Sequence, residues 1–211
     1  MKTTARPLFL CASLFWSACV NMRASGEFQA GREALLAGNS KVAAAYFQSV
    51  ARDDPNYVYG TALQQNIWSY LGRAQYAAGS FSDARTALQK SLLVNQRNPH
   101  VAQLYLGLTM ARSGDRQQSL GPIESGLKGI HEWLEYITEA HRFSFGQFWD
   151  PRREIRSSIE ANLAMLSGKE IDWERLLTDG ERLGMRMEEE ADRARQDERA
   201  DLDRDGDDGR Q

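Results

Sequence analysis

The fold is decided by residues 68–91, which read WSYLGRAQYAAGSFSDARTALQKS. Near the middle of this stretch, a small residue, a glycine and a polar residue follow one another as Ala78-Gly79-Ser80. The same kind of triplet occurs at residues 37–39 and again at residues 113–115. Aligning the three triplets brings the sequence around them into register, which indicates that the stretch is one copy of an internal repeat.

Three further positions of the repeat carry similar residues in every copy. A glycine lies seven residues before the central glycine, a small residue five after it, and a large apolar residue nine after it. In chain order these positions hold Gly31, Gly72 and Gly107, then Ala43, Ala84 and Ser119, then Phe47, Leu88 and Ile123. Glycine inside a helix costs about 0.5–1 kcal/mol relative to alanine, so its recurrence at one position indicates close packing between helices.

This pattern resembles the tetratricopeptide repeat, whose two antiparallel helices carry Trp-x2-Leu-Gly before a turn and Ala-x3-Phe after it. The middle copy matches best, with Trp68, Leu71 and Gly72 before the turn and Ala84 and Leu88 after it. The central glycines are 41 and 35 residues apart, against a family period of about 34. We expect the extra residues, near 56–60, to form a longer loop or an extended helix start. The resemblance implies an all-α fold, a short α-solenoid of helix-turn-helix repeats.

The chain divides into a repeat region and a cap. We expect three repeats over residues 25–129, at about 25–56, 61–98 and 99–129, and capping helices over residues 130–199. Gly121-Pro122 interrupts the third repeat, where we expect the second helix to kink or restart. Residues 200–211 are rich in Asp and Gly, which predicts an acidic disordered tail. The alternative is a non-repeating helical bundle with accidental self-similarity.

An aromatic cluster connects two of the capping helices. It comprises Phe143, Phe145, Phe148 and Trp149. We expect it to form a hydrophobic plug over the last repeat, whose apolar face would otherwise be open. The alternative is an exposed patch that binds a partner or enters a bilayer.

Two aspartates indicate where the capping helices begin. Asp150 precedes Pro151, which is typical of a helix N-cap followed by proline at the first helical position. Asp172 is placed to cap the last long helix in the same way.

Residues 1–18 have the layout of a secretory signal peptide. Lys2 and Arg6 precede an apolar run over residues 7–16, and the small residues Ser17 and Ala18 precede Cys19. These last three residues resemble the bacterial lipobox, in which the chain is cut before a cysteine that then carries lipid. Lipidated Cys19 and residues up to 24 would then form a short tether. Plain secretion, and an uncleaved anchor or cytosolic location, are the alternatives.

The residue after the lipidated cysteine bears on localisation. Val20 is not an aspartate retention signal, so by analogy with lipoprotein sorting we expect an outer membrane lipoprotein facing the periplasm. Without the lipid, the protein would be periplasmic.

Composition argues against several classes of function. The formal net charge of −3 gives no basic surface for nucleic acid. Cys11 and Cys19 are the two cysteines, so a chain starting at Cys19 would lack free thiols for catalysis, metal binding or haem attachment. The three histidines lack ligand spacing. We therefore expect no enzymatic activity, no cofactor and no metal.

A run resembling a calcium-binding loop occurs in the tail. It begins Asp201-x-Asp203-x-Asp205-Gly206, and such a loop needs a bidentate carboxylate at its twelfth position. That position would lie beyond Gln211, so we expect a solvated acidic tail.

The resemblance also places candidate binding residues. In this family the first helix of each repeat lines the concave surface, with the residue after the repeat's glycine pointing inward. These residues are Arg32, Arg73 and Leu108, and four more would face inward as well: Asn66, Ser69, Tyr76 and Arg112. Arg32 above Arg73 would form a cationic strip suited to a carboxylate-bearing or extended peptide. The alternative is that both arginines pair with nearby acids or face water.

The sequence therefore predicts a non-enzymatic protein–protein interaction scaffold or assembly factor, anchored at the cell envelope, with a protein or peptide partner in its groove. An oligomer-forming structural subunit that self-associates through residues 170–199 is the alternative. An enzyme would need a pocket with convergent polar groups, and no motif points to one. The oligomeric state is left open.

Overall fold

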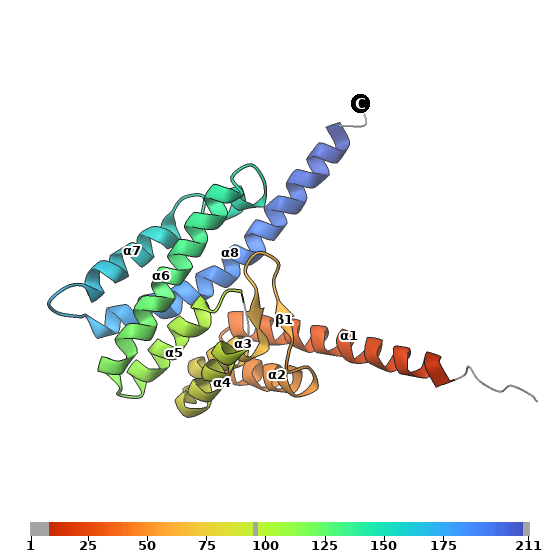
Figure 1. Cartoon of the computed structure of the whole chain (residues 1–211), viewed down its shortest axis with the longest axis horizontal. Helices are drawn as coiled ribbons and strands as arrows, with labels where there is room; N and C mark the ends of the chain where they lie inside the picture. The colour runs from red at the N-terminus through yellow and green to blue at the C-terminus, as the bar shows by residue number, and fades with distance from the viewer. Residues whose placement is uncertain (1–8, 95–96, 209–211) are drawn as a thin grey trace, which may run out of the picture.

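The computed structural model describes residues 9–94 and 97–208, with side chains over residues 23–94 and 97–200. The described chain is helical except for one short hairpin, which confirms the all-α prediction (Figure 1). The elements in order are α1 (Phe9–Leu36), α2 (Ser40–Asp53), β1 (Val58–Tyr59), β2 (Gln65–Asn66), α3 (Ile67–Ala77), α4 (Phe81–Leu93), α5 (His100–Arg112), α6 (Arg116–Ala140), the 3-10 helix η1 (Phe145–Phe148), α7 (Glu154–Leu166) and α8 (Trp173–Asp208).

The three repeats are the helix pairs α1–α2, α3–α4 and α5–α6. The turn of each pair contains the central glycine of the repeat in the left-handed region, at φ +79° for Gly38, +77° for Gly79 and +96° for Gly114. A side chain at this conformation would be strained, whereas glycine adopts it freely. The triplets used to align the sequence are therefore the turns between paired helices.

The second recurring glycine brings the two helices of a repeat together. A β-carbon at this position would lie 2.7 Å from the ring of Phe47 at Gly31, 2.5 Å from Leu88 Cγ at Gly72 and 2.6 Å from Ile123 Cγ1 at Gly107. In every repeat the large apolar residue thus packs onto the glycine of its own repeat. The expected close packing is correct, and the partner of each glycine lies within the repeat.

The extra residues of the first interval form the β1–β2 hairpin. Its strands pair antiparallel, with Val58 opposite Asn66 and Tyr59 opposite Gln65. The amide of Ile67 donates to the Tyr57 carbonyl at 2.9 Å, which joins the hairpin to the start of α3. A strand pair therefore replaces the loop or extended helix that the sequence suggested.

Helix α6 continues through Pro122 without a break and spans 25 residues. It crosses the expected boundary at residue 129, so the second helix of the third repeat and the first capping helix are one element. Proline costs about 3 kcal/mol inside a helix, but α6 buries a long apolar face, on which Ile123, Leu127, Ile130 and Leu134 are each at most 1% exposed. Burial of each such side chain contributes about 1.5–3 kcal/mol, which outweighs the local penalty.

The aromatic connector is mostly a plug. Trp149 is buried and meets Trp133 of α6 edge-on, with ring centroids 4.8 Å apart. Phe145 and Phe148 are partly buried against the same cluster. Phe143 is the exception: its side chain is 87% exposed and stacks under the guanidinium of Arg142.

The two predicted helix caps differ in outcome. Asp172 caps α8 as expected, accepting a hydrogen bond from the Arg175 amide at 3.1 Å. Helix α7, however, begins at Glu154 and not beside Pro151. The Asp150 carboxylate still caps this helix, although it lies four residues before Glu154. It accepts a hydrogen bond from the Ile155 amide at 2.9 Å.

The predicted terminal segments are helical where they are described. Helix α1 runs without interruption through residues 19–24, which corrects the expectation of a short tether there. Helix α8 likewise continues to Asp208, where disorder was expected from residue 200, because no proline stops it. Residues 1–8 of the predicted signal peptide and residues 209–211 lie outside the described chain. None of the helices described is long and apolar enough to cross a membrane.

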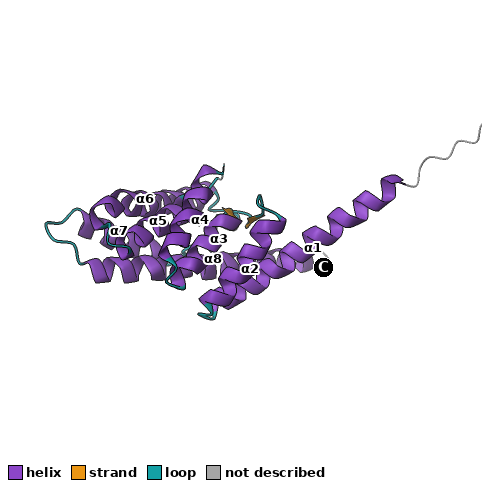
Figure 2. Cartoon of the chain, turned by 90° about the horizontal axis from the view of Figure 1, so that it is seen from below, coloured by secondary structure: helices purple, strands orange, loops and turns teal. Residues whose placement is uncertain are grey.

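The apolar side chains form two clusters. The smaller cluster joins α1, α2 and one side of α3 around Phe28 and Phe47. The larger cluster joins α5, α6, α7 and α8, and Tyr76, Ala84 and Leu88 of the middle repeat belong to it as well. Figure 2 shows α5, α6 and α7 grouped at the end of the molecule away from α1. Helix α8 crosses the inner side of the repeats and contacts helices of both clusters.

Candidate functional site

The concave surface of the repeats is occupied by helix α8 of the same chain (Figure 1). Glu188 of α8 pairs with Arg32 of α1 and with Arg73 of α3. Farther along, Gly180 of α8 lies against Leu108 of α5. An open groove was expected, and the structure differs because the cap folds back across the first helix of every repeat.

Two glycines allow α8 to approach this closely. A β-carbon at Gly180 would lie 2.9 Å from Leu108 Cδ2, and one at Gly184 would collide with the ring of Tyr105. The two positions are four residues apart, so they lie on one face of the helix. The carbonyl of Gly184 also accepts a hydrogen bond from Arg73 Nη2 at 3.1 Å.

The Glu188 carboxylate is the centre of a buried polar cluster. Its Oε1 lies 2.6 Å from Arg73 Nη1 and its Oε2 lies 3.1 Å from Arg32 Nη2. Gln65 Nε2 donates to Oε1 at 3.0 Å, and the Tyr70 hydroxyl donates to Oε2 at 3.3 Å. All five side chains are buried. The cluster joins α1, α3, the hairpin and α8 at a single point.

A second carboxylate also binds Arg32. Asp192, one turn after Glu188, lies 3.0 Å from Arg32 Nη2 and is 35% exposed. Asp192 pairs with Arg195 of α8 as well, so three arginines share the two acids. Buried ion pairs of this kind contribute more to the choice of partner and position than to net stability, because both charges must lose water.

The environment of Glu188 favours its charged form. Burial alone would raise the pKa of Glu188, but the charges and hydrogen bonds of Arg73 and Arg32 outweigh it and hold the pKa below its ordinary value of 4.5. The structure therefore binds this carboxylate as an anion.

Acid should weaken this cluster. Because the folded-state pKa of Glu188 is depressed, the stability it contributes is complete above pH 4.5 and is lost as pH falls through the folded-state pKa. Urea unfolding of the wild type and of Glu188→Gln at several pH values between 7 and 3 should show a difference that is constant near neutrality and shrinks below pH 4.5. A difference that stays unchanged down to pH 3 would contradict this account.

Two more predicted residues, Tyr76 near the end of α3 and Arg112 at the end of α5, form a second, more open contact with α8. Arg112 Nη2 lies 3.0 Å from Glu181 Oε1, and the Tyr76 hydroxyl donates to the same oxygen. Beside them lies a cavity of about 350 Å³, with walls that include Tyr76, Phe81 and Tyr105. Arg112 is 30% exposed, so this end of the groove remains accessible to solvent.

The other three predicted residues do not face a groove. Asn66 caps α3, because its Oδ1 accepts a hydrogen bond from the Ser69 amide at 3.0 Å. Its Nδ2 donates a hydrogen bond to the Ser91 carbonyl. The Ser69 hydroxyl donates to Gln65, and Leu108 is fully buried under α8. Their side chains serve the internal packing of the repeats, and their role in binding a partner stays a prediction.

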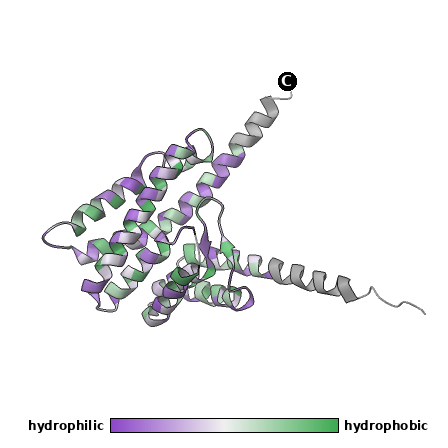
Figure 3. Ribbon diagram, in the orientation of Figure 1, coloured by the Kyte–Doolittle hydropathy of each residue, from purple (hydrophilic) through white to green (hydrophobic). Residues whose placement is uncertain are grey.

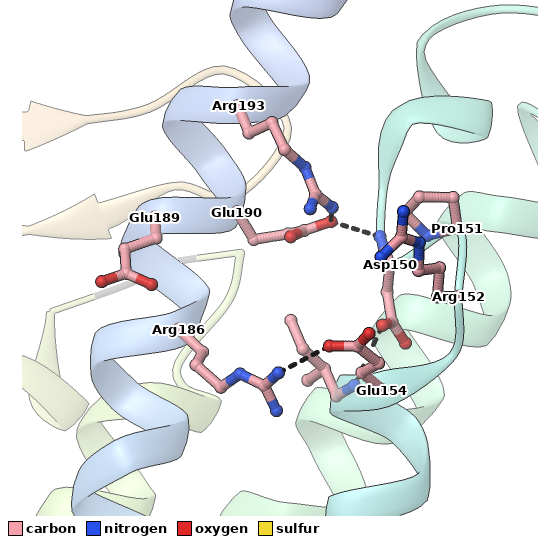
Figure 4. Close-up of a pocket in the computed structure, with 9 residues that line it drawn as sticks. Asp150, Pro151, Arg152, Glu154, Arg186, Glu189, Glu190 and Arg193 are labelled. Atoms are coloured by element: carbon pink, nitrogen blue, oxygen red, sulfur yellow. Dashed lines mark hydrogen bonds and ion pairs between the residues drawn. The ribbon is translucent and has the colours of Figure 1, made fainter.

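A separate polar cleft of about 380 Å³ lies between α8 and the segment before α7 (Figure 4). Arg186 of α8 pairs with Glu154 across it at 2.7 Å, and Glu190 accepts the Asp150 amide. Asp150 has φ +42°, an uncommon conformation for a residue other than glycine. Its carboxylate also pairs with buried Arg156 at 3.0 Å. This network fixes the path of the chain into α7.

Over the described residues, no group of three or more His, Cys, Asp or Glu side chains could hold a metal ion.

The most important site residue was missed by the sequence analysis. Glu188 lies four residues after Gly184, on the buried side of α8, so its place in the helical stripe was a usable signal. The partners Gln65 and Tyr70 carried no signal, because only the folded chain brings them to Glu188.

Comparison with known families supports the repeat assignment. A tetratricopeptide repeat model matches residues 34–106, from the last turn of α1 into α5. The match covers the second helix of the first repeat, the complete middle repeat and the first half of α5. Repeats of this type are typically non-enzymatic modules for protein–protein interaction. Searches among curated proteins and among solved structures found no match.

Proposed function

We propose that this protein is a non-enzymatic scaffold that binds partner proteins through its helical repeats and is anchored at the cell envelope by a lipid on Cys19. The observation that carries the proposal is the engagement of α8 by the inner side of the repeats. Arg32 and Arg73 there bind a carboxylate of a helix at 3.1 and 2.6 Å. The surface thus has the chemistry needed to recognise a helical protein segment.

The position of Cys19 suits a lipid anchor close to the repeats. Cys19 lies in α1, five residues before Ala24, which is buried against the first repeat. At about 1.5 Å of rise per residue, a helical connection of this length would hold the repeats within about 10 Å of the anchor. Partners would then be gathered at the membrane surface, in an outer membrane lipoprotein facing the periplasm.

Self-association through the last helix has less support. Four large apolar residues of α8 are buried inside the chain: Leu176, Leu177, Leu183 and Met187. A dimer formed through that face would first have to expose them. We therefore favour a scaffold over a self-associating structural subunit.

Changing the anchor residue should test this proposal. Cys19→Ala should abolish acylation and move the protein from the membrane fraction to the soluble exported fraction, because Cys11 would leave with the signal peptide and no other cysteine remains to carry the lipid. Partners crosslinked to the wild type in intact membranes should disappear from the membrane fraction together with it. Cell fractionation, labelling with a radioactive fatty acid and crosslinking would measure the three effects.

The control for this experiment is Cys11→Ala, which should leave acylation and fractionation unchanged. A wild-type protein that takes up no fatty acid would refute the anchor. A protein that is acylated but captures no partner in repeated crosslinking would refute the scaffold.

A further inference from the structure

Helix α8 is held in the groove by two different kinds of contact. Its first half, up to Met187, is fixed by large apolar side chains that are each at most 3% exposed. Beyond Met187, as far as side chains are described, the apolar contacts come from Ala191 and Ala194. Figure 3 shows the described part of α8 turning hydrophilic toward its C-terminal end. We call residues 188–200 the distal segment.

The contacts of the distal segment with the first repeat and the hairpin are mainly ionic. Glu188 and Asp192 both bind Arg32, at 3.1 and 3.0 Å. Arg195 stacks on the ring of Tyr59, 4.9 Å from its centroid, and Arg32 lies 4.7 Å from the same centroid. A cleft of about 360 Å³ runs between α1 and α8 beside these groups. Water therefore reaches the edge of this interface.

Release of the distal segment would break the hydrogen bond from the Asp150 amide to Glu190 and withdraw Ala194 from the larger cluster, but it would leave the packing of the first repeat intact. The cluster around Phe28 and Phe47 draws its members from α1 to α4 and includes no residue of α8. Release would, however, leave Arg32 and Arg73 without their carboxylates, although these arginines are only 6% and 1% exposed. Unpaired buried charges are strongly unfavourable. A segment that replaces α8 must therefore bring carboxylates of its own.

We propose that the distal segment occupies the binding site of the partner protein. The partner displaces it and places an acidic amphipathic helix of its own on Arg32 and Arg73. Two carboxylates four residues apart, as Glu188 and Asp192 are, would reach the two arginines. Small residues on the same face, as at Ala191 and Ala194, would allow an equally close approach. This inference rests on the proposed scaffold function and specifies the partner surface.

A labelled peptide with the sequence of residues 184–200 would test the proposal against the full chain. Fluorescence anisotropy should show saturable binding of this peptide, and replacing its two key acids, Glu188→Gln and Asp192→Asn, should weaken binding at least tenfold. The matched control is a peptide with Glu189→Gln, since Glu189 is exposed and next to Glu188. Its affinity should stay within twofold of the unchanged peptide.

Changes in the chain itself should act in the opposite direction. Glu188→Gln in the full chain weakens the internal competitor, so the unchanged peptide should bind this variant at least tenfold more tightly than the wild type. If that variant does not fold, Asp192→Asn, which removes the half-buried acid alone, should still improve binding at least threefold. Glu189→Gln in the full chain should leave peptide affinity unchanged.

Several results would overturn the inference. If replacing the two acids of the peptide does not change its affinity, or if no variant binds the peptide, then a second helix cannot replace α8 on Arg32 and Arg73. Hydrogen exchange of residues 188–200 that is as slow as that of residues 173–187 would show that the distal segment does not open. If the wild-type protein is a dimer and the peptide dissociates it, the helix that binds the two arginines comes from a second copy of this chain and not from another protein. If membrane partners are still crosslinked in any of these cases, the proposed scaffold function remains supported even though this inference is wrong.

Discussion

Glu188→Gln should lower the free energy of unfolding by about 3–5 kcal/mol, the cost expected when one partner of a buried ion pair is removed. Glutamine has nearly the shape of glutamate, so the loss comes from charge and not from a cavity. Arg73, 1% exposed and 2.6 Å from the carboxylate, would lose its counter-charge inside the protein. Urea denaturation at pH 7, followed by circular dichroism, would measure the change.

Glu189→Gln is the matched control for this prediction. Glu189 is exposed on the same helix, so its substitution should change the free energy of unfolding by no more than about 0.5 kcal/mol. If the two variants were equally stable, the cluster of Glu188 with Arg32 and Arg73 would not be buried as the structure has it.

Gly126→Ala should destabilise the protein by about 1–3 kcal/mol through overpacking. A β-carbon at this position would lie 2.5 Å from the amide nitrogen of Leu104 and 2.6 Å from its Cα. These are backbone atoms in the middle of α5, so they cannot turn aside as the end of a side chain would. Helices α5 and α6 would have to separate, which would disturb the core around Ile123 and Leu127. Thermal and urea unfolding would both report the loss.

Gly26→Ala in α1 provides the opposite expectation. Gly26 is exposed, and a β-carbon there would meet nothing within 4 Å. Alanine is favoured over glycine inside a helix by about 0.8–1 kcal/mol, so this variant should be slightly more stable than the wild type. If both glycine variants were stabilised, the close contact between α5 and α6 would be contradicted.

Much of the repeat architecture could be predicted because it depends on short-range patterns. The turn glycines, such as Gly79, need a left-handed backbone, and the helix glycines, such as Gly72, accept a large residue from the paired helix. Both requirements recur at fixed spacings, so they can be recognised without knowing the rest of the fold. The course of α6 could not be predicted this way, because burial along its whole length outweighs the local effect of Pro122.

The candidate site depended on contacts between distant parts of the chain. Arg73 and Glu188 are 115 residues apart in the sequence, and nothing near either residue indicates the other. The acidic composition of residues 200–211 favoured a solvated tail, and a glutamate in the helix before it would usually face water as well. Glu188 is the exception because the preceding turns of α8 carry it into the groove.

The sequence by itself determined the helical repeats, their turns and the glycines that join their helices, because each follows from local backbone chemistry and periodic spacing. It also placed Arg32 and Arg73 on the inner side of the repeats, through resemblance to a known family. The tertiary structure alone decided what those arginines bind. Gly180 and Gly184 let α8 lie against α5, the apolar first half of α8 fixes its direction, and Glu188 then reaches both charges. That outcome depends on the packing of the whole chain, which no local pattern encodes.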